Sequence, residues 1–335
     1  MTNDFSKGTK ISRRALLAAA GGTVCTAYAG LVMSQPPEYP NKLVRVIVPY
    51  PPGGPTDIVS RVICNGLGTR LKQAFTVENR PGASGMIGAD VIAKAPPDGY
   101  NLLINVSGHI VNPALYAKMT HDPLKDFKPI TNLAVTPIVL VVSANSDIHS
   151  VADLIKTVRA QPGRHGFASS SSGTPGHLTG EVFKGMHKLD VQHIPYKGAA
   201  PALTDLIGGQ VTFMFDSMPS SINLIKGGKL RALGVTSKAR LGVLPDLPTF
   251  EEIGMPEINL TTWYGFWAPA RTPDEIVNRL YQETSQLLQS PEVKAKLHEV
   301  QADPVGDTPA NFAAFCVAEA RRYAAIVQQA HIKLG

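Results

Sequence analysis

The sequence predicts an α/β protein built from two lobes, and three observations support this. Strand patterns and helix patterns alternate along the chain, which is typical of helices layered on largely parallel sheets. About 300 residues follow the N-terminal segment, more than one hydrophobic core usually serves. The apolar strand TTWYGFWAPA, which begins at Thr261, then follows the second group of elements and is interpreted as the return of the chain to the first lobe. Two connections between lobes imply a hinge.

Each element is predicted from its own apolar pattern. The first lobe is expected to contain the strand VRVIV, a helix after Pro55, the strand TVENR, a helix from Ile87 to Ala93, and the strand YNLLINV. The second unit, from about Ser143, is expected to contain the helix Val151–Ala160, a strand near Phe167, a helix after Pro175, the strand VQHIPY, the helix Ala199–Leu206, and the strands VTFMF and LRALGVT. Two helices, Glu275–Gln289 and Ala310–Gln328, close the chain.

The run PYPPGGPTD, Pro49–Asp57, joins the first strand to its helix and is the first candidate binding site. The first turn of a helix has N–H groups without intrahelical partners and a partial positive charge, so it stabilises an anion. Gly53 and Gly54 allow a ligand to approach the backbone, and Pro55 suits the first helical position. A well-capped helix start without a ligand is the alternative.

A second run of this kind, FASSSSGTPGH at residues 167–177, opens a helix at Thr174 and Pro175. Neither run contains the GxGxxG or the Gly-Lys-Ser/Thr pattern of nucleotide-binding loops. Two anion-receptive helix starts that lie far apart in the sequence predict a cleft that holds a small anion between two lobes.

Residues 1–29 are predicted to be a cleaved export signal. Arg13 and Arg14 precede two leucines and an apolar Ala/Gly-rich run, and residues 27–29 match a small-residue cleavage site. The paired arginines resemble the twin-arginine type of signal. An uncleaved anchor and a lipid anchor at Cys25 are the alternatives. We therefore expect a periplasmic protein.

The charge balance argues against a nucleic-acid partner. The chain has 32 Lys and Arg and 26 Asp and Glu, a net charge of +6. Loss of residues 1–29 would remove four basic residues and one acidic residue and leave +3. This balance is too even for nucleic-acid binding, but it would help to attract a small anion.

No pattern indicates an enzyme, a metal site or a cofactor. The nine histidines are scattered without an HExxH pattern, and GASGM around Ser84 lacks the GxSxG order of a nucleophile elbow. We expect a binding protein without catalytic residues. Cys64 and Cys316 lie in helical apolar patterns, so buried free thiols are expected, and a disulfide between them is the alternative.

A series of motifs runs from about Pro40 to the end of the chain: PYPPGGPTD, ENRPGASGMIGA, APPDGYNLL, NPALY, DFKPIT, SSSSGTPGH, PYKGAAPALTDLIGGQV, MFDSMPSS, KLRALGVTS, LPDLPTFEEIG, WYGFWAPA and DPVGDTPANF. In this order they resemble the substrate-binding receptors of tripartite tricarboxylate transporters, the Bug family. The resemblance implies a type II periplasmic binding protein fold, in which two Rossmann-like α/β lobes, joined by crossing strands, close like a flytrap on a small organic carboxylate. Residues 37–140 and 262–335 would form lobe 1, and residues 141–261 would form lobe 2.

The resemblance also implies a membrane partner. The loaded receptor, expected to be a monomer, would deliver its carboxylate to integral membrane permease subunits. The alternative is a ligand-sensing receptor that docks on a signalling partner and has no transport role. The sequence does not name the carboxylate.

The helix-start positions and the resemblance together predict the ligand-binding residues. In lobe 1 they are Tyr50, Pro52, Gly53, Gly54, Pro55, Thr56, Asp57, Ser84, Gly85, Ser107 and Gly108. In lobe 2 they are Ser169, Ser170, Ser171, Ser172, Gly173, Thr174, His177, Tyr196, Lys197, Gly198 and Asp216.

Some of these assignments have alternatives. His177, in the first turn of its helix, is a neutral donor to the ligand or a structural residue. Asp216 receives an ammonium or hydroxyl group of the ligand, or it caps the helix at Pro219. The aromatic residues of the strand at 263–267 are expected in the core, with one of them lining the cleft as the alternative. His109, in a loop where family members usually carry threonines, leaves the specificity open.

Overall fold

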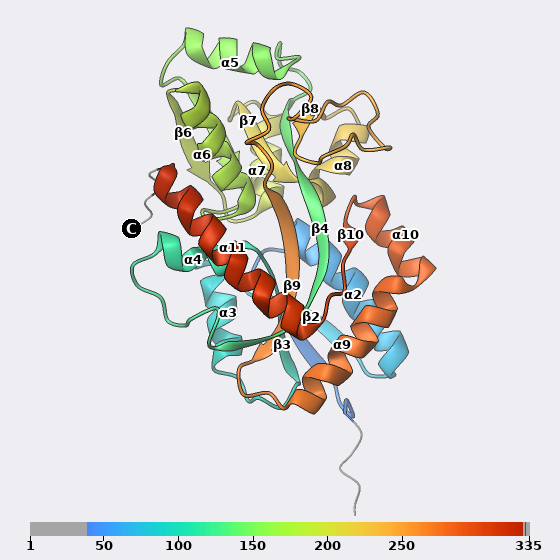
Figure 1. The fold of residues 1–335 in the computed structure, drawn as a ribbon. Coiled ribbons are helices and arrows are strands. Elements are labelled where there is room, and N and C mark those ends of the chain that lie inside the picture. The colour runs from blue at the N-terminus through green and yellow to red at the C-terminus, as the bar shows by residue number, and fades with distance from the viewer. Residues whose placement is uncertain (1–38, 331, 333–335) are drawn as a thin grey trace, which may run out of the picture. The chain divides into compact units, whose positions relative to one another are not determined.

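The computed structural model describes residues 39–330 and residue 332 (Figure 1). Contacts separate residues 1–39 from residues 40–335, and the second unit is described below. The predicted export signal, residues 1–29, lies outside the described residues. Within the described part, no helix has the length and apolar character needed to cross a bilayer.

Ten strands form one sheet in the order β2-β1-β3-β9-β4-β7-β5-β6, and β8 and β10 also pair with β4. The strands are β1 (Val44–Val48), β2 (Phe75–Asn79), β3 (Asn101–Val106), β4 (Phe127–Ser143), β5 (His165–Ser169), β6 (Val191–Pro195), β7 (Phe213–Ser217), β8 (Leu230–Val235), β9 (Thr261–Pro269) and β10 (Asp303–Pro304). Parallel pairs occur at both ends of this order: β1 with β2 and β3, and β5 with β6 and β7.

The long strands β4 and β9 cross between the two halves of the sheet (Figure 1). The first part of β4 pairs with β9, from Phe127 opposite Pro269 to Pro137 opposite Thr261. From Ile138 onward, β4 pairs with β7 and β8 instead. All of these pairings are antiparallel. The prediction of largely parallel sheets was therefore wrong for the crossing strands. The lobe boundaries at residues 140/141 and 261/262 stay a prediction.

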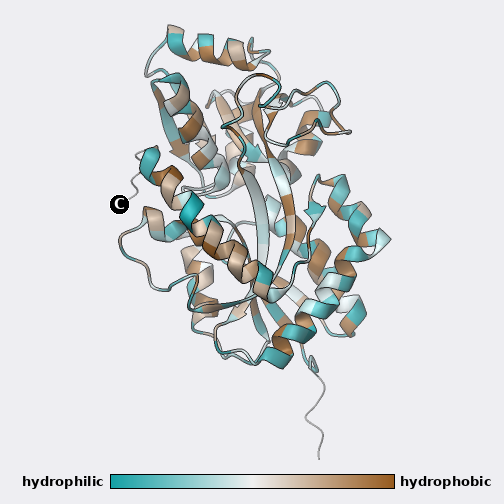
Figure 2. Ribbon diagram, in the orientation of Figure 1, coloured by the Kyte–Doolittle hydropathy of each residue, from teal (hydrophilic) through white to brown (hydrophobic). Residues whose placement is uncertain are grey.

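Helices cover both halves of the sheet. They are α2 (Pro55–Leu71), α3 (Met86–Ala93), α4 (Gly108–Leu115), α5 (Val151–Ala160), α6 (Pro175–His187), α7 (Ala199–Ile207), α8 (Met218–Lys226), α9 (Asp274–Gln289), α10 (Pro291–Glu299) and α11 (Pro309–Gln329), with a 3₁₀ turn at Ala83–Gly85. In Figure 2, α9 and α10 alternate hydrophobic and hydrophilic residues, as expected for helices that bury one face.

The returning strand β9 supplies the centre of the core beneath the first half. Trp263, Tyr264, Phe266 and Trp267 are at most 1% exposed, so the core interpretation of this aromatic group is confirmed. Trp263 and Trp267 both pack against Phe312 of α11.

Apart from the crossing strands, helices α4 and α11 also join the two halves, through hydrophobic packing. Val111 of α4 and Tyr323 of α11 belong to the same buried cluster as Phe167 and Phe183, which come from the β5–α6 region. The apolar contact on this side is therefore continuous between the first half and the second.

Cys64 and Cys316 are free and buried, so the expectation of free thiols is confirmed and the disulfide alternative is not. Burial raises the pKa of each thiol to about 12, which keeps both in the unreactive protonated form. In a variant that begins near Pro40, we expect Ellman's reagent to titrate both thiols only after unfolding in guanidinium. Rapid reaction of either thiol in the native protein would contradict this burial.

Candidate binding cleft

Two adjoining hollows lie where the loops of the two halves meet. The inner cavity is lined by Tyr50, Pro51, Gly54, Pro55, Thr56, Val106, Ser170, Thr174, Pro175, Gly176, Gly198, Ala199, Phe215, Asp216, Ser217 and Thr262. The outer pocket is lined by Pro49, Tyr50, Pro51, Pro81, Gly82, Ala83, Ser84, Gly85, Ser170, Ser171, Ser172, Pro195, Tyr196 and Lys197. Their volumes are about 30 Å³ and 430 Å³. The inner cavity therefore has room for about two water molecules, which is close to the size of one carboxylate group.

Four helices begin at the inner cavity. Its lining includes the residues that precede or open α2, α6, α7 and α8, namely Gly54, Thr174, Gly198 and Ser217. Pro55 and Pro175 occupy the first position of α2 and α6, as the sequence predicted. Because the first turn of each helix presents N–H groups and a partial positive charge, the four helix starts together favour a negative charge in the cavity.

None of these four helices has a side-chain hydrogen bond at its N-cap. By contrast, Ser150, Ser290 and Thr308 cap α5, α10 and α11, which begin elsewhere. The missing caps are not confined to the cavity, since α9 also lacks one. At the inner cavity, however, the missing caps leave first-turn N–H groups open to a ligand. No lysine, arginine or histidine is among the residues that line this cavity.

Asp57 holds the loop between β1 and α2 in place. Its buried carboxylate accepts hydrogen bonds from the Gly53 N–H (3.0 Å), from Arg61 Nε (2.9 Å) and from Asn79 Nδ2 (3.0 Å). Asn79 also donates to the Tyr50 carbonyl (2.9 Å). Burial alone would raise the pKa of Asp57, but these donors outweigh it and hold the pKa below its usual range. The Asp57 carboxylate therefore accepts the hydrogen bond of the Gly53 N–H, and neither residue lines either hollow.

The second loop of the first half has a strained backbone. Ala83 and Ser84 have φ angles of 45° and 53°, in the left-handed region that costs a residue with a Cβ roughly 1 kcal/mol or more. The Ser84 hydroxyl lies 2.6 Å from the Tyr116 hydroxyl and accepts a hydrogen bond from Ser171 Oγ at 3.4 Å. The loop is thus held in contact with the serine run of the second half, at the outer pocket.

Asp216 is the one acidic residue that lines the inner cavity. It is 2% exposed, and its Oδ2 accepts hydrogen bonds from the hydroxyls of Ser220 and Ser221 in α8. Burial raises the pKa of Asp216 to about 6, although these two hydroxyls and the Ser217 N–H act in the opposite direction.

Tyr196 and Lys197 line the outer pocket on the side of the second half. The Tyr196 hydroxyl donates to Asp205 Oδ2 (2.6 Å), which fixes the direction of the ring. Burial and this acidic neighbour raise the pKa of Tyr196 to about 12, so the hydroxyl keeps its proton. The outer pocket therefore combines a lysine, several hydroxyls and ample space.

Most predicted site residues line one of the two hollows, and some do not. Those outside both linings are Pro52, Gly53, Asp57, Ser107, Gly108, Ser169, Gly173 and His177. Ser169 turns inward and bonds the His193 ring at 2.7 Å. Sequence reasoning missed Val106 of β3, Phe215 of β7 and Thr262 of β9, which line the inner cavity.

His177 lies behind the cleft rather than in it. Its Nδ1 accepts a hydrogen bond from the Gly173 N–H (3.1 Å), and its ring stacks on His193 with centroids 4.0 Å apart. Burial, with smaller contributions from His193 and Lys184, lowers the pKa of His177 to about 3, so the ring is neutral. These contacts support the structural alternative.

His177, Glu181 and His193 bring potential metal-ligating atoms within 4.8 Å of one another, which the sequence spacing did not indicate. The Gly173 hydrogen bond makes Nδ1 of His177 an acceptor, so Nε2 carries the proton and cannot ligate an ion in this tautomer. Two imidazoles stacked face to face also direct their in-plane lone pairs past each other. We therefore assign this group to the packing of the loop after β5.

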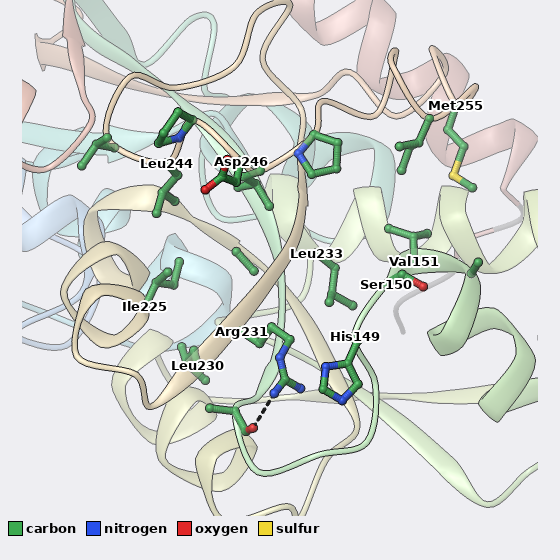
Figure 3. A pocket seen from close by; sticks show the side chains of 18 of the residues that line it. His149, Ser150, Val151, Ile225, Leu230, Arg231, Leu233, Leu244, Asp246 and Met255 are labelled. Carbon is green, nitrogen blue, oxygen red and sulfur yellow. Dashed lines mark hydrogen bonds between the residues drawn. The ribbon is translucent and has the colours of Figure 1, made fainter.

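A larger hollow of about 890 Å³ lies on the second half and shares no residue with the cleft. Figure 3 shows it between β8, the start of α5 and the loop around Leu244 and Asp246. The Arg231 guanidinium donates to the carbonyls of Ala144, Ser146 and Ile148, which ties this side chain to the fold. The lining is otherwise mostly apolar and lacks the convergent donors of the cleft.

A family model described as "Tripartite tricarboxylate transporter family receptor" matches residues 59–332. The chain belongs to this family. The protein BugT of Bordetella pertussis is 35% identical over 321 residues, which cover 95% of this chain and 98% of BugT. The structure "R. palustris Rpa4515 with adipate" is 36% identical, with a TM-score of 0.86 and coverage of 89% of this chain and 100% of that chain. The structure of MatC (Rpa3494) from Rhodopseudomonas palustris, with bound malate, is 30% identical, with a TM-score of 0.82 and coverage of 86% and 100%.

These findings confirm the resemblance to the Bug receptors and the two-lobe periplasmic binding protein fold. Tripartite tricarboxylate transporter receptors are periplasmic solute-binding proteins, not a family of enzymes. The two hollows described above are lined by loops from both halves of the sheet.

Proposed function

We propose that this receptor captures a small organic dicarboxylate in the periplasm and delivers it to integral membrane permease subunits. The observation that carries the proposal is the meeting of four uncapped helix starts at a cavity without a basic side chain. One carboxylate group would occupy the inner cavity and accept hydrogen bonds from backbone N–H groups. The related structures with adipate and malate support this ligand class.

The outer pocket supports a second polar end on the ligand. It shares Tyr50, Pro51 and Ser170 with the inner cavity, so one molecule could extend through both hollows. Lys197 could bind a second carboxylate there, and the hydroxyls of Ser84 and Ser171, which are bonded to each other, would have to reorient to donate to it. Because ligand contacts from both lobes stabilise the closed form, such a ligand would also drive closure.

A calorimetric and thermal-shift panel tests the proposal. The panel contains adipate, malate, succinate and citrate, with hexanoate as the monocarboxylate and adipamide as the uncharged control. At a concentration 100 times the Kd, a ligand should stabilise the fold by about 2.7 kcal/mol, which corresponds to a Tm increase of about 4 °C for a protein of this size. We expect at least one dicarboxylate to reach this shift and adipamide to give none. If no carboxylate shifts the Tm or releases heat of binding, the proposed function is wrong.

A further inference from the structure

We propose that Asp216 takes up a proton when the receptor binds its carboxylate, so that the neutral acid donates a hydrogen bond to the bound anion. This inference rests on the proposed function. It assigns to Asp216 a role that neither the ammonium-binding nor the capping interpretation contains.

A carboxylate that binds in the inner cavity would bring its negative charge next to the negative charge of Asp216. Its side chain is buried and lines the inner cavity together with Thr174, Ser217 and Thr262. A cavity of about 30 Å³ leaves no room for a layer of water between Asp216 and an anion held at the helix starts. Two carboxylates that share so small a site do not both stay ionised, and one of them holds a proton, as in the aspartic protease pair.

The surroundings of Asp216 supply hydroxyl groups but no positive side chain. From α8, Ser220 and Ser221 donate to Oδ2. On β9, Tyr264 lies close to Asp216. Burial is the main cause that raises the pKa of Tyr264, and the negative charge of Asp216 is the second. From the loop after β1, Tyr50 lines the same cavity, and the nearest basic residue among the two linings is Lys197 in the outer pocket. Among the described residues that line the inner cavity, no side-chain cation therefore offsets a second negative charge beside Asp216.

The pKa of the Asp216 carboxyl group is already raised before a ligand binds. Burial has raised the pKa of Asp216 to about 6, so at pH 7.5 the unliganded group is mainly ionised but close to its titration range. An anion beside it raises this pKa further. The proton comes from the buffer and forms an O–H bond on Asp216, while the buffer acid becomes its conjugate base. Above pH 6 the Kd should therefore rise with pH, by up to about tenfold per unit, until the pKa of the complex is reached.

Isothermal titration calorimetry in two buffers measures the proton directly. Adipate and malate are titrated at pH 7.5 in phosphate and in Tris, because the difference in observed enthalpy divided by the difference in buffer ionisation enthalpy gives the number of protons bound. For the wild type we expect uptake of about 0.5 to 1 proton per ligand. For Asp216→Asn, whose amide can donate the same hydrogen bond, we expect retained binding, uptake near zero and a Kd that does not change between pH 6.5 and 8. The control Asp246→Asn, at an exposed acid in the distant hollow, should match the wild type.

The outcomes separate the two proposals. Carboxylate binding by the wild type without proton uptake would overturn the inference and leave the proposed function intact. Undiminished uptake in Asp216→Asn would place the proton on the ligand and would also overturn it. If neither probe nor any other carboxylate of the panel binds, the proposed function fails and the inference fails with it. The wild-type proton count is decisive even if Asp216→Asn does not fold.

Discussion

Gly54→Leu is expected to weaken dicarboxylate binding by at least about 100-fold, or about 2.7 kcal/mol, and to leave the Tm of the unliganded receptor almost unchanged. The backbone at Gly54 has φ −78° and ψ 167°, a conformation open to any residue. A Cβ built there meets only the Pro51 carbonyl at 3.5 Å, an ordinary contact. The rest of a leucine side chain would enter the inner cavity, where it would displace the carboxylate and obstruct Thr174 and Gly198 of the opposite lobe.

Calorimetry with adipate and malate measures the affinity, and thermal unfolding of the unliganded protein measures the stability. Gly185→Leu is the matched control, because Gly185 is an exposed helical glycine with no atom within 4 Å of a built Cβ. Unchanged affinity in Gly54→Leu would show that the inner cavity is not where the ligand binds. A large loss of Tm would show instead that this turn is structural.

The fold could be predicted wherever an element has its own local signal. The helices at Pro55 and Pro175 were predicted because a proline at the first position and an apolar stripe occur together there. Strand β4 was missed because Pro129 and Pro137 interrupt its 17 residues. A register shift in the pairing with β9 follows Pro129, and Pro137 is the last residue of β4 that pairs with β9. Helix α4 was missed because it has no side-chain cap and contains Pro113, so its position depends on packing against α11 and the 3₁₀ turn.

The loops that line the candidate cleft could be predicted from the sequence, but the direction of each side chain could not. Gly54, Thr174 and Gly198 line the cavity because helix starts at the ends of strands face it. Asp57 and His177 belong to the same loops, yet their side chains turn back to bond Gly53 and Gly173. The direction of such a side chain depends on residues that are distant in the sequence but close in the fold. Asn79 is an example, because the parallel pairing of β1 with β2 brings it to the loop between β1 and α2.

Asp57→Ala is expected to lower the free energy of unfolding by about 3 kcal/mol and to weaken carboxylate binding as well. The change removes the carboxylate that accepts hydrogen bonds from the Gly53 N–H and the Asn79 amide. Hydrogen bonds to a charged group contribute roughly 1.5–3 kcal/mol each, and these two bonds are only partly buried. Released from Asp57, the loop between β1 and α2 would no longer hold Gly54 and Thr56 at the inner cavity. The control Arg61→Ala removes the half-exposed partner only, so we expect it to cost less than 1 kcal/mol.

The dependence of this loss on pH identifies its cause. The folded-state pKa of Asp57 lies below its ordinary value of 3.8, so its stabilising contribution is complete above about pH 4 and disappears as the pH falls through the folded-state value. Urea unfolding of the wild type and of Asp57→Ala should therefore give a constant difference in unfolding free energy from pH 5 to 8 and a smaller difference at pH 3. A difference that stays constant down to pH 3 would mean that the variant loses packing rather than a charged hydrogen-bond acceptor. Because the same carboxylate organises the loop that we propose to receive the ligand, binding and stability should fall together in Asp57→Ala but separate in Gly54→Leu.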